Sequence, residues 1–179
     1  MIRDIAARRY GEAAFQIATD QGAEDAWSDG LAAMAAVFSD PDADALLRAA
    51  RVSYEDKAAF VTKTLEGVDP LLLNLALLLV HRDRTSLGPQ VREAFQELLD
   101  ARRGIAHAVV TTAVPISDSE SRAVADKLSE ISGARVVVET QVDDAIIGGL
   151  VARIGDKLID GSTRSRLESL KRRLEEARA

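Results

Sequence analysis

The sequence predicts a mainly α-helical protein with a smaller α/β part: an N-terminal six-helix bundle, followed by a C-terminal domain with a small β-sheet and two helices. Up to residue 104 the apolar residues recur every three or four positions, which is the period of an α-helix. At Ile105 this period changes, and the stretch IAHAVVTTAVP is β-branched, as in strands. Hydrophobic residues make up 47% of the 179 residues and aromatic residues only 4%, so small and aliphatic side chains must build the core. The boundary between two domains, 1–104 and 105–179, is therefore expected near Gly104.

The first expected helix, Ile2 to Ala18, carries two apolar stripes and so offers two faces for burial. One stripe consists of Ile2, Ala6, Tyr10, Ala13, Ala14 and Ile17, and the other, lined by small residues, of Ala7, Gly11, Phe15 and Ala18. The second helix has one core-facing stripe, made of Trp27, Leu31, Met34, Ala35 and Phe38. Asp40-Pro41-Asp42 is expected to end it, and a short third helix to follow over Ala43–Ala50 with Leu46 and Leu47 inward.

Capping residues mark the next helices. Ser53 is expected to cap the fourth, in which Phe60, Val61 and Leu65 are buried. Asp69 caps the fifth, and Pro70 takes its first position, where a missing N–H costs nothing. This fifth helix is apolar all round from Leu71 except for Asn74, so it must be covered on every side. The sixth starts at Ser86, ends at Arg102-Arg103-Gly104, and carries inward Leu87, Val91, Ala94, Phe95 and Leu98.

The C-terminal part starts with a strand, IAHAVVTTAVP, that ends at Pro115. Ser117 and Glu120 form a capping box, which predicts a helix ending before Gly133. Its inward residues are expected to be Val124, Ala125, Leu128 and Ile131, and a second strand is predicted by the alternation of Val136, Val138, Thr140 and Val142.

The stretch from Ile146 to Leu167, IIGGLVARIGDKLIDGSTRSRL, predicts a hairpin that leads into a final helix. Leu150, Ala152 and Ile154 alternate along one strand, Gly155-Asp156 supplies a tight turn, and Leu158 and Ile159 run back antiparallel. Asp160-Gly161 ends the hairpin, and Ser162 is a favoured N-cap for the helix that follows. We expect Gly148, Gly149 and Gly155 to serve a bulge and a turn, and the last helix to carry a coiled-coil seam of Leu167, Leu170, Leu174 and Ala177.

No catalytic, cofactor or metal site is predicted. His81 and His107 have no carboxylate or cysteine partner at a motif spacing. The glycines of the hairpin form neither a GxGxxG motif nor a phosphate loop, because Asp156 follows Gly155 where Lys-Ser or Lys-Thr would be needed. Cysteine is absent, which excludes disulfides and thiolate chemistry.

Charge and hydropathy limit which partners the protein is expected to bind. The net charge of -6 gives the whole chain no reason to bind nucleic acid or anionic lipid. The stretch Arg153 to Arg173 is locally basic, so a helical adaptor that binds nucleic acid through its C-terminal helix stays an alternative, although the stretch lacks interleaved aromatic residues. MIRDIAARRY has no apolar signal core, and Leu71–Val80 is far shorter than the ~20 residues that cross a bilayer. A cytoplasmic protein is therefore expected.

The fifth helix and the two-faced first helix have more apolar surface than one bundle readily explains. Both helices could be central in the bundle, or the two could line a groove for a partner helix.

Three stretches resemble the delta subunit family of bacterial F-type ATP synthases, whose mitochondrial counterpart is the oligomycin sensitivity-conferring protein. They are ARRYGEAAFQIA from Ala7, RDRTSLGPQVREAFQELLDARRG from Arg82 and, most specifically, DDAIIGGLVARIGDKLIDGSTRSRLESL from Asp143. Gly11 stands where the family usually has alanine, which is expected to make the first helix flexible. Larger aliphatic residues are usual in the family at the positions of Thr85, Gly88 and Ala152.

The resemblance implies a non-catalytic stator subunit without a cofactor, on the cytoplasmic face of the inner membrane as part of the ATP synthase complex. Residues 1–104 would grip the N-terminal helix of an alpha subunit, and residues 105–179 would meet the b subunits of the peripheral stalk, so that the catalytic head resists rotor torque during proton-driven ATP synthesis. The implied groove for the alpha subunit consists of Ala6, Tyr10, Ala13, Ala14, Ile17, Leu71, Asn74 and Leu78. The implied stalk-binding residues are Leu167, Leu170 and Leu174. The implied structural signature consists of Gly148, Gly149, Gly155, Asp156, Asp160, Gly161 and Ser162.

Overall fold

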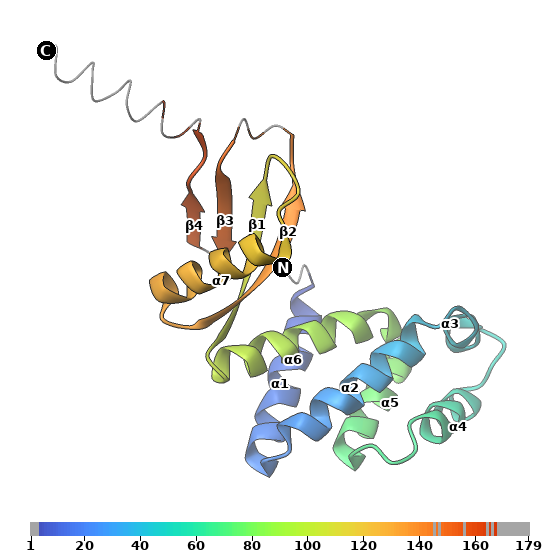
Figure 1. Ribbon diagram of the computed structural model, residues 1–179. Helices are drawn as coiled ribbons and strands as arrows, with labels where there is room; N and C mark the ends of the chain where they lie inside the picture. The colour runs from blue at the N-terminus through green and yellow to red at the C-terminus, as the bar shows by residue number, and fades with distance from the viewer. Residues whose placement is uncertain are drawn as a thin grey trace, which may run out of the picture. The chain divides into compact units, whose positions relative to one another are not determined.

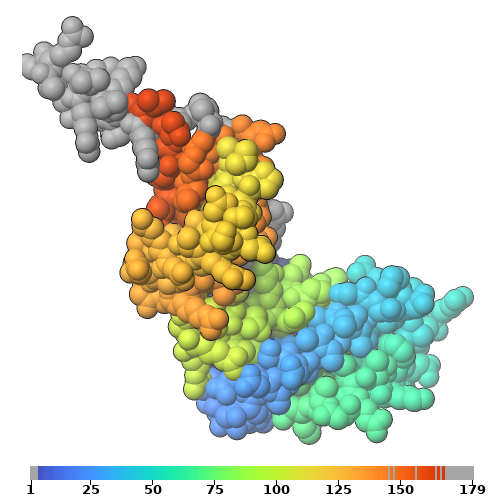
Figure 2. Space-filling view, in the orientation of Figure 1, coloured from blue at the N-terminus to red at the C-terminus, as the bar shows by residue number. Residues whose placement is uncertain are grey.

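The chain folds into two compact units, Met1–Leu99 and Asp100–Ala179. The computed structural model describes residues 4–144, 146, 148–155, 157–163, 165 and 167. Within these residues the protein is mainly helical, with seven α-helices and one four-stranded sheet. In Figure 1 the helices of the first unit run from blue to green, and the strands of the second from yellow to red. Figure 2 shows the close packing of side chains within each unit.

The first unit is helical throughout. Its elements are α1 (Ile5–Gln21), α2 (Glu24–Ser39), α3 (Pro41–Arg48), α4 (Tyr54–Thr64), α5 (Pro70–His81), a 3-10 turn η1 (Thr85–Leu87) and α6 (Gly88–Arg102). The predicted caps are confirmed, because Ser53 and Asp69 accept backbone N–H groups at the starts of α4 and α5. The predicted start of the third helix at Ala43 is wrong. Asp40 caps α3 and Pro41 occupies its first turn, so the helix starts two residues earlier.

The core of the helical unit contains the predicted stripe of α2, whose five members are all buried. Large side chains from α5 and α6, such as Leu72, Leu79 and Phe95, are also fully buried. Two inward predictions are wrong: Leu46 is 36% exposed and Leu98 is only half-buried. The core side of α6 follows the i, i+4 positions Val91, Phe95 and Leu99, which leaves Leu98 at its margin. Likewise Phe60 is half-buried, whereas Val61 and Leu65 are buried as predicted.

On α1, the small-residue stripe faces the core. Ala7, Gly11, Ala14 and Ala18 are buried, and Phe15 packs edge-on against Phe95 with ring centroids 5.7 Å apart. An added Cβ at Gly11 would lie 2.4 Å from the Cβ of Ala94. Glycine therefore lets α1 and α6 approach closely.

The second unit contains β1 (Ile105–Thr112), α7 (Asp118–Ser132), β2 (Arg135–Val142), β3 (Leu150–Ile154) and β4 (Lys157–Asp160). The strand order is β2-β1-β3-β4. β1 pairs with β2 in parallel, which requires the crossover through α7, and with β3 antiparallel. The capping box of Ser117 and Glu120 is confirmed at the start of α7.

The core of this unit lies between α7 and the sheet. Leu128 from α7 is buried together with Ala108, Val110, Val136 and Ala152 from the strands, and Val124 packs against them. Ile131, predicted inward, is 62% exposed, because it lies in the last turn of α7, beyond the turns that cover the sheet. Val142 at the end of β2 is 51% exposed. Buried and exposed residues therefore alternate only at the beginning of this strand, and not along its whole length as predicted.

Candidate partner-binding surfaces

The outer stripe of α1 is partly open at the surface. Ala13 is exposed, and Ala6, Tyr10 and Ile17 are half-buried. Ala14 was predicted with them, but it is only 2% exposed and belongs to the core stripe of this helix. The positions 7, 11, 14 and 18 follow one helical face, which explains why Ala14 turns away from the outer stripe.

The α5 helix has one open stripe. Leu72, Ala76, Leu79 and Val80 are buried, whereas Leu71 is 44% exposed, Leu78 is 40% exposed and Asn74 between them is exposed as well. The bundle of this chain therefore does not cover the helix on every side, in agreement with the expectation that α5 has more apolar surface than one bundle explains. Two large apolar side chains in the stripe i, i+3, i+7 remain available to a partner.

The hairpin of β3 and β4 continues past its last strand pair. The strands pair from Val151 with Asp160 to Ile154 with Lys157, as predicted. Beyond β4, the N–H of Gly161 donates to the carbonyl oxygen of Leu150, and the N–H of Thr163 donates to that of Gly148, both at 2.9 Å. The start of the final helix is thus tied directly to the chain that enters β3.

Glycine is required where these two segments meet. Gly149 has φ +82°, and a Cβ added there would lie 2.5 Å from the carbonyl oxygen of Gly161 and 3.0 Å from the Cα of Ser162. At Gly148 an added Cβ would lie 3.0 Å from Oγ1 of Thr163. Gly155 has φ +54° in the hairpin turn, with open space around it. Gly149 therefore permits a close backbone approach, Gly148 leaves room for the Thr163 side chain, and Gly155 permits a turn.

Asp160 and Ser162 organise the first turn after the hairpin. Oδ1 of Asp160 accepts the N–H of Ser162 at 2.8 Å, and Oδ2 accepts the hydroxyl of Ser165 at 2.5 Å. Oγ of Ser162 accepts the N–H of Ser165 at 3.2 Å, which is the geometry of an N-cap. Hydrogen bonds from the Ser165 hydroxyl and then from Ser162 lower the pKa of Asp160.

The backbone of Thr163, Ser165 and Leu167 is helical, and Leu167 is 58% exposed. Asp156 of the predicted signature, and Leu170 and Leu174 of the predicted seam, lie outside the described residues.

The two histidines lie in different surroundings. Nε2 of His107 lies 2.7 Å from Oδ2 of Asp100, a carboxylate partner that motif spacing did not reveal. The imidazole of His107 is 59% exposed and the carboxylate of Asp100 is 11% exposed. His81 packs edge-on against Tyr54 with ring centroids 5.1 Å apart. Among the described residues, no three His, Asp or Glu side chains are grouped as metal ligands would be.

A pocket of about 520 Å³ lies beside η1, and its lining residues do not form a recognisable catalytic arrangement. Its lining consists of Leu47, Arg48, Ala50, Lys57, Asp83, Thr85 and Ser86. No helix within the described ranges is both long and apolar enough to span a membrane.

The fold and these surfaces define a class: a two-part binding protein, with a helical unit that leaves apolar side chains open and an α/β unit whose hairpin is followed by helical backbone at Thr163, Ser165 and Leu167. The model of the ATP synthase delta (OSCP) subunit family matches residues 6–174, and the chain belongs to this family. It is 35% identical over 172 residues to ATP synthase subunit delta of Dehalococcoides mccartyi, with 96% of this chain and 95% of that protein covered. It is 36% identical over 176 residues to ATP synthase subunit delta of a Geobacillus species, with 97% and 99% covered.

A solved structure shows the same fold. A chain of the Toxoplasma gondii mitochondrial ATP synthase hexamer superposes with a TM-score of 0.64 at 19% identity, covering 96% of this chain and 98% of that one. Members of the family are structural subunits of the peripheral stalk of ATP synthase. The protein is therefore a stator subunit and not an enzyme.

Proposed function

We propose that this subunit links the catalytic head of ATP synthase to the peripheral stalk through two separate binding surfaces. Residues 1–104, acting as one six-helix bundle, bind the N-terminal helix of an alpha subunit. Residues 105–179 bind the b subunits. The observation that carries the first assignment is the open apolar stripe of α5, where Leu71 and Leu78 are 44% and 40% exposed while Leu72, Ala76, Leu79 and Val80 are buried.

The surface for the alpha subunit combines this stripe with the outer stripe of α1. Its members are Ala6, Tyr10, Ala13 and Ile17 of α1 and Leu71, Asn74 and Leu78 of α5. Burying an exposed Leu or Ile side chain yields roughly 1.5 to 3 kcal/mol, whereas association costs ~4 to 15 kcal/mol. A partner helix must therefore cover the whole stripe, and the Asn74 amide supplies the polar contact that fixes its register.

The surface for the stalk starts at the hairpin. The hydrogen bonds of Asp160 and Ser162 fix the first turn of the final helix, and Leu167 in that helix is 58% exposed. Leu167, Leu170 and Leu174 are spaced like a coiled-coil seam, which suits the helical b subunits. The subunit would then act on the cytoplasmic face of the inner membrane, which it reaches only through its partners.

The substitution Ala13→Asp tests the first surface. A peptide of the alpha-subunit N-terminal helix should bind the variant at least a hundredfold more weakly, because an unpaired buried carboxylate costs several kcal/mol. Ala33→Asp is the matched control, since Ala33 is also exposed but lies on α2. Equal binding of the peptide by wild type and a folded Ala13→Asp variant would show that the groove is elsewhere.

Truncation tests whether the two surfaces bind different partners. A chain ending at Gly104 should keep the alpha-subunit peptide and lose the b subunits in a pull-down. Co-purification of this truncated chain with b would refute the second assignment.

A further inference from the structure

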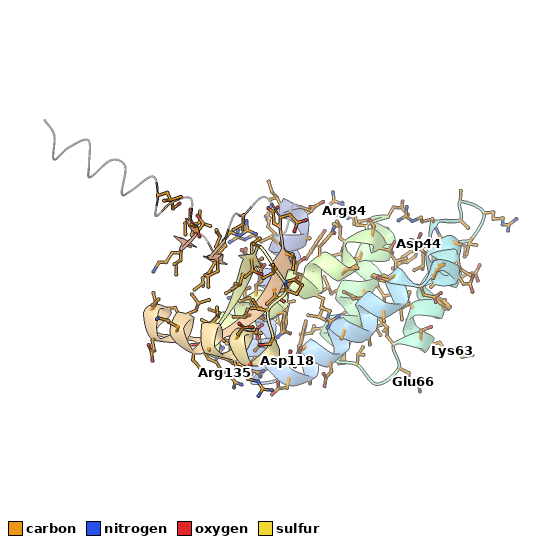
Figure 3. All side chains as sticks on the ribbon, turned by 45° about the horizontal axis from the view of Figure 1, so that its top comes forward. Asp44, Lys63, Glu66, Arg84, Asp118 and Arg135 are labelled. Carbon is orange, nitrogen blue, oxygen red and sulfur yellow. The ribbon has the colours of Figure 1, made fainter. Side chains whose placement is uncertain are left out.

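Along the outer edge of β2, the backbone groups of the first half have hydrogen-bond partners, whereas those of the second half are open to an added strand. β2 has a single strand neighbour in the described sheet, β1, and is therefore an edge strand (Figure 1). It starts at Arg135, which is labelled in Figure 3. The strand has eight residues and contains no proline, so two common protections of an edge, shortness and proline, are both missing.

The direction of each backbone group in β2 follows from the parallel pairing. The N–H groups of Arg135 and Asp143 donate to the carbonyl oxygens of Gly104 and Thr112, on the β1 side, both at 2.9 Å. Because the direction alternates along a strand, the N–H and C=O groups of the even-numbered residues point outward, away from β1. The N–H of Val136 confirms this direction, since it donates outward to Oγ of Ser129 at 2.9 Å.

Serines at the end of α7 close only the first part of this edge. Oγ of Ser129 accepts the N–H of Val136, and Oγ of Ser132 accepts the N–H of Ala134 at 3.3 Å. Further along, the outward groups belong to Val138, Thr140 and Val142. Thr140 is exposed and Val142 is 51% exposed. This open half offers N–H and C=O groups in the spacing that an added strand needs.

The segment that contains the open half is acidic. From Val136 to Val151 the chain has three acidic residues, Glu139, Asp143 and Asp144, and no basic one. The side chains of Val138, Thr140 and Val142 lie on one face of the strand, whereas Glu139 and Gln141 lie on the other face and are exposed. An added strand would therefore meet apolar side chains on one face and negative charge on the other.

We propose that the Val138–Val142 half of the β2 edge is a docking site for an extended basic segment of a partner protein, with apolar and basic residues alternating. The segment adds a fifth strand to the sheet. A second copy of this chain is a poor fit, because two such edges would bring Glu139, Asp143 and Asp144 of one copy against those of the other. The site lies within residues 105–179, but it shares no residue with the stripes of α1 and α5 or with Leu167, Leu170 and Leu174, and it stands independently of them.

A fluorescent nine-residue peptide of alternating valine and lysine, titrated with the full-length protein, tests the site by anisotropy. We expect saturable binding that weakens with salt, and no binding of the same peptide with glutamate in place of lysine. Thr140→Pro should weaken binding at least tenfold, because it removes an outward N–H while leaving the ladder to β1 intact. Thr140→Val, which keeps the N–H, should bind like wild type. Circular dichroism checks that each variant is folded.

Two further peptides keep the test decisive if Thr140→Pro fails to fold. One is N-methylated on its valines only and the other on its lysines only. An added strand directs alternate N–H groups toward its neighbour, so one of these peptides should lose binding and the other keep it. Binding of both would mean that charge alone attracts the peptide, and binding of neither would mean that the peptide does not bind as a strand with alternating N–H groups; either result would overturn the proposal. A dimer of the free protein in light scattering that Thr140→Pro abolishes would likewise overturn it in favour of a second copy.

Discussion

The backbone of Gly149 passes so close to that of Gly161 that a side chain at position 149 would collide with it. An added Cβ would lie 2.5 Å from the Gly161 carbonyl oxygen, and the φ angle of +82° already disfavours any residue with a side chain. The contact joins the chain entering β3 to the chain leaving β4. The direction of the final helix therefore depends on two residues without side chains.

Gly149→Ala should destabilise the second unit by roughly 1 to 3 kcal/mol, from the positive φ and the backbone collision. Hydrogen exchange measured by mass spectrometry should show faster exchange in β3, β4 and residues 161–163. Gly155→Ala is the control, because Gly155 also has a positive φ but open space around it, and it should cost only about 1 kcal/mol. Equal effects of the two substitutions would show that the collision is relieved by a small shift.

Gly11→Ala should weaken the contact between α1 and α6. Overpacking costs about 1 to 3 kcal/mol, while alanine gains about 1 kcal/mol of helix propensity over glycine. The informative measurement is the double variant Gly11→Ala with Ala94→Gly, which removes the colliding Cβ and should recover stability beyond the sum of the single changes. Urea unfolding followed by Trp27 fluorescence reports on this unit, because Trp27 is the single tryptophan and is buried there.

Ala101→Gly provides the propensity control for that cycle. Ala101 lies in α6 like Ala94, but it is exposed. Additive effects of Gly11→Ala and Ala94→Gly would contradict the proposed contact.

The start of α7 should depend on pH through Glu120. Hydrogen bonds from the backbone N–H of Ser117 and then from its hydroxyl lower the pKa of Glu120 from its ordinary 4.5. A lowered folded-state pKa means that the carboxylate stabilises the helix fully above pH 4.5, and that this contribution is lost as the pH falls through the folded-state value. A carboxyl NMR titration should place the Glu120 midpoint below 4.5. Glu120→Gln, which keeps an acceptor at every pH, should show no such loss of protection in the first turn of α7.

Ser162→Ala should loosen the start of the final helix. The substitution removes the acceptor for the N–H of Ser165, and loss of an N-cap costs about 0.5 to 2 kcal/mol. Amide exchange at Ser165 should accelerate, whereas Ser162→Asp, another good N-cap, should restore protection. Unchanged exchange in Ser162→Ala would mean that Asp160 alone holds this turn.

The features that sequence predicts well are local. The caps at Ser53, Asp69 and Ser117 follow from a side chain and a backbone group no more than three residues apart, so a short window contains both partners. The hairpin of β3 and β4 was predictable for the same reason, since its turn and both strands lie within about a dozen residues.

The remaining features depend on contacts between distant segments. Both stripes of α1 have helical period, and only the close approach of Ala94 to Gly11 selects the small-residue stripe for the core. Ala14, which was predicted to line the groove, therefore lies in the core. The same limit applies to His107, whose partner Asp100 lies in a different element, and to Ile131, whose exposure depends on how much of α7 the sheet can cover.

The alanine and glycine face of α1 has a thermodynamic consequence. Small side chains bury little apolar area, so α1 gains less from each turn that it packs than α2 or α5 do with their leucines and aromatics. A ligand that binds a folded element stabilises it in proportion to the logarithm of its concentration over its dissociation constant. A partner bound to the outer stripe of α1 should therefore slow amide exchange more in α1 than in α2, which would make this helix a sensitive reporter of assembly.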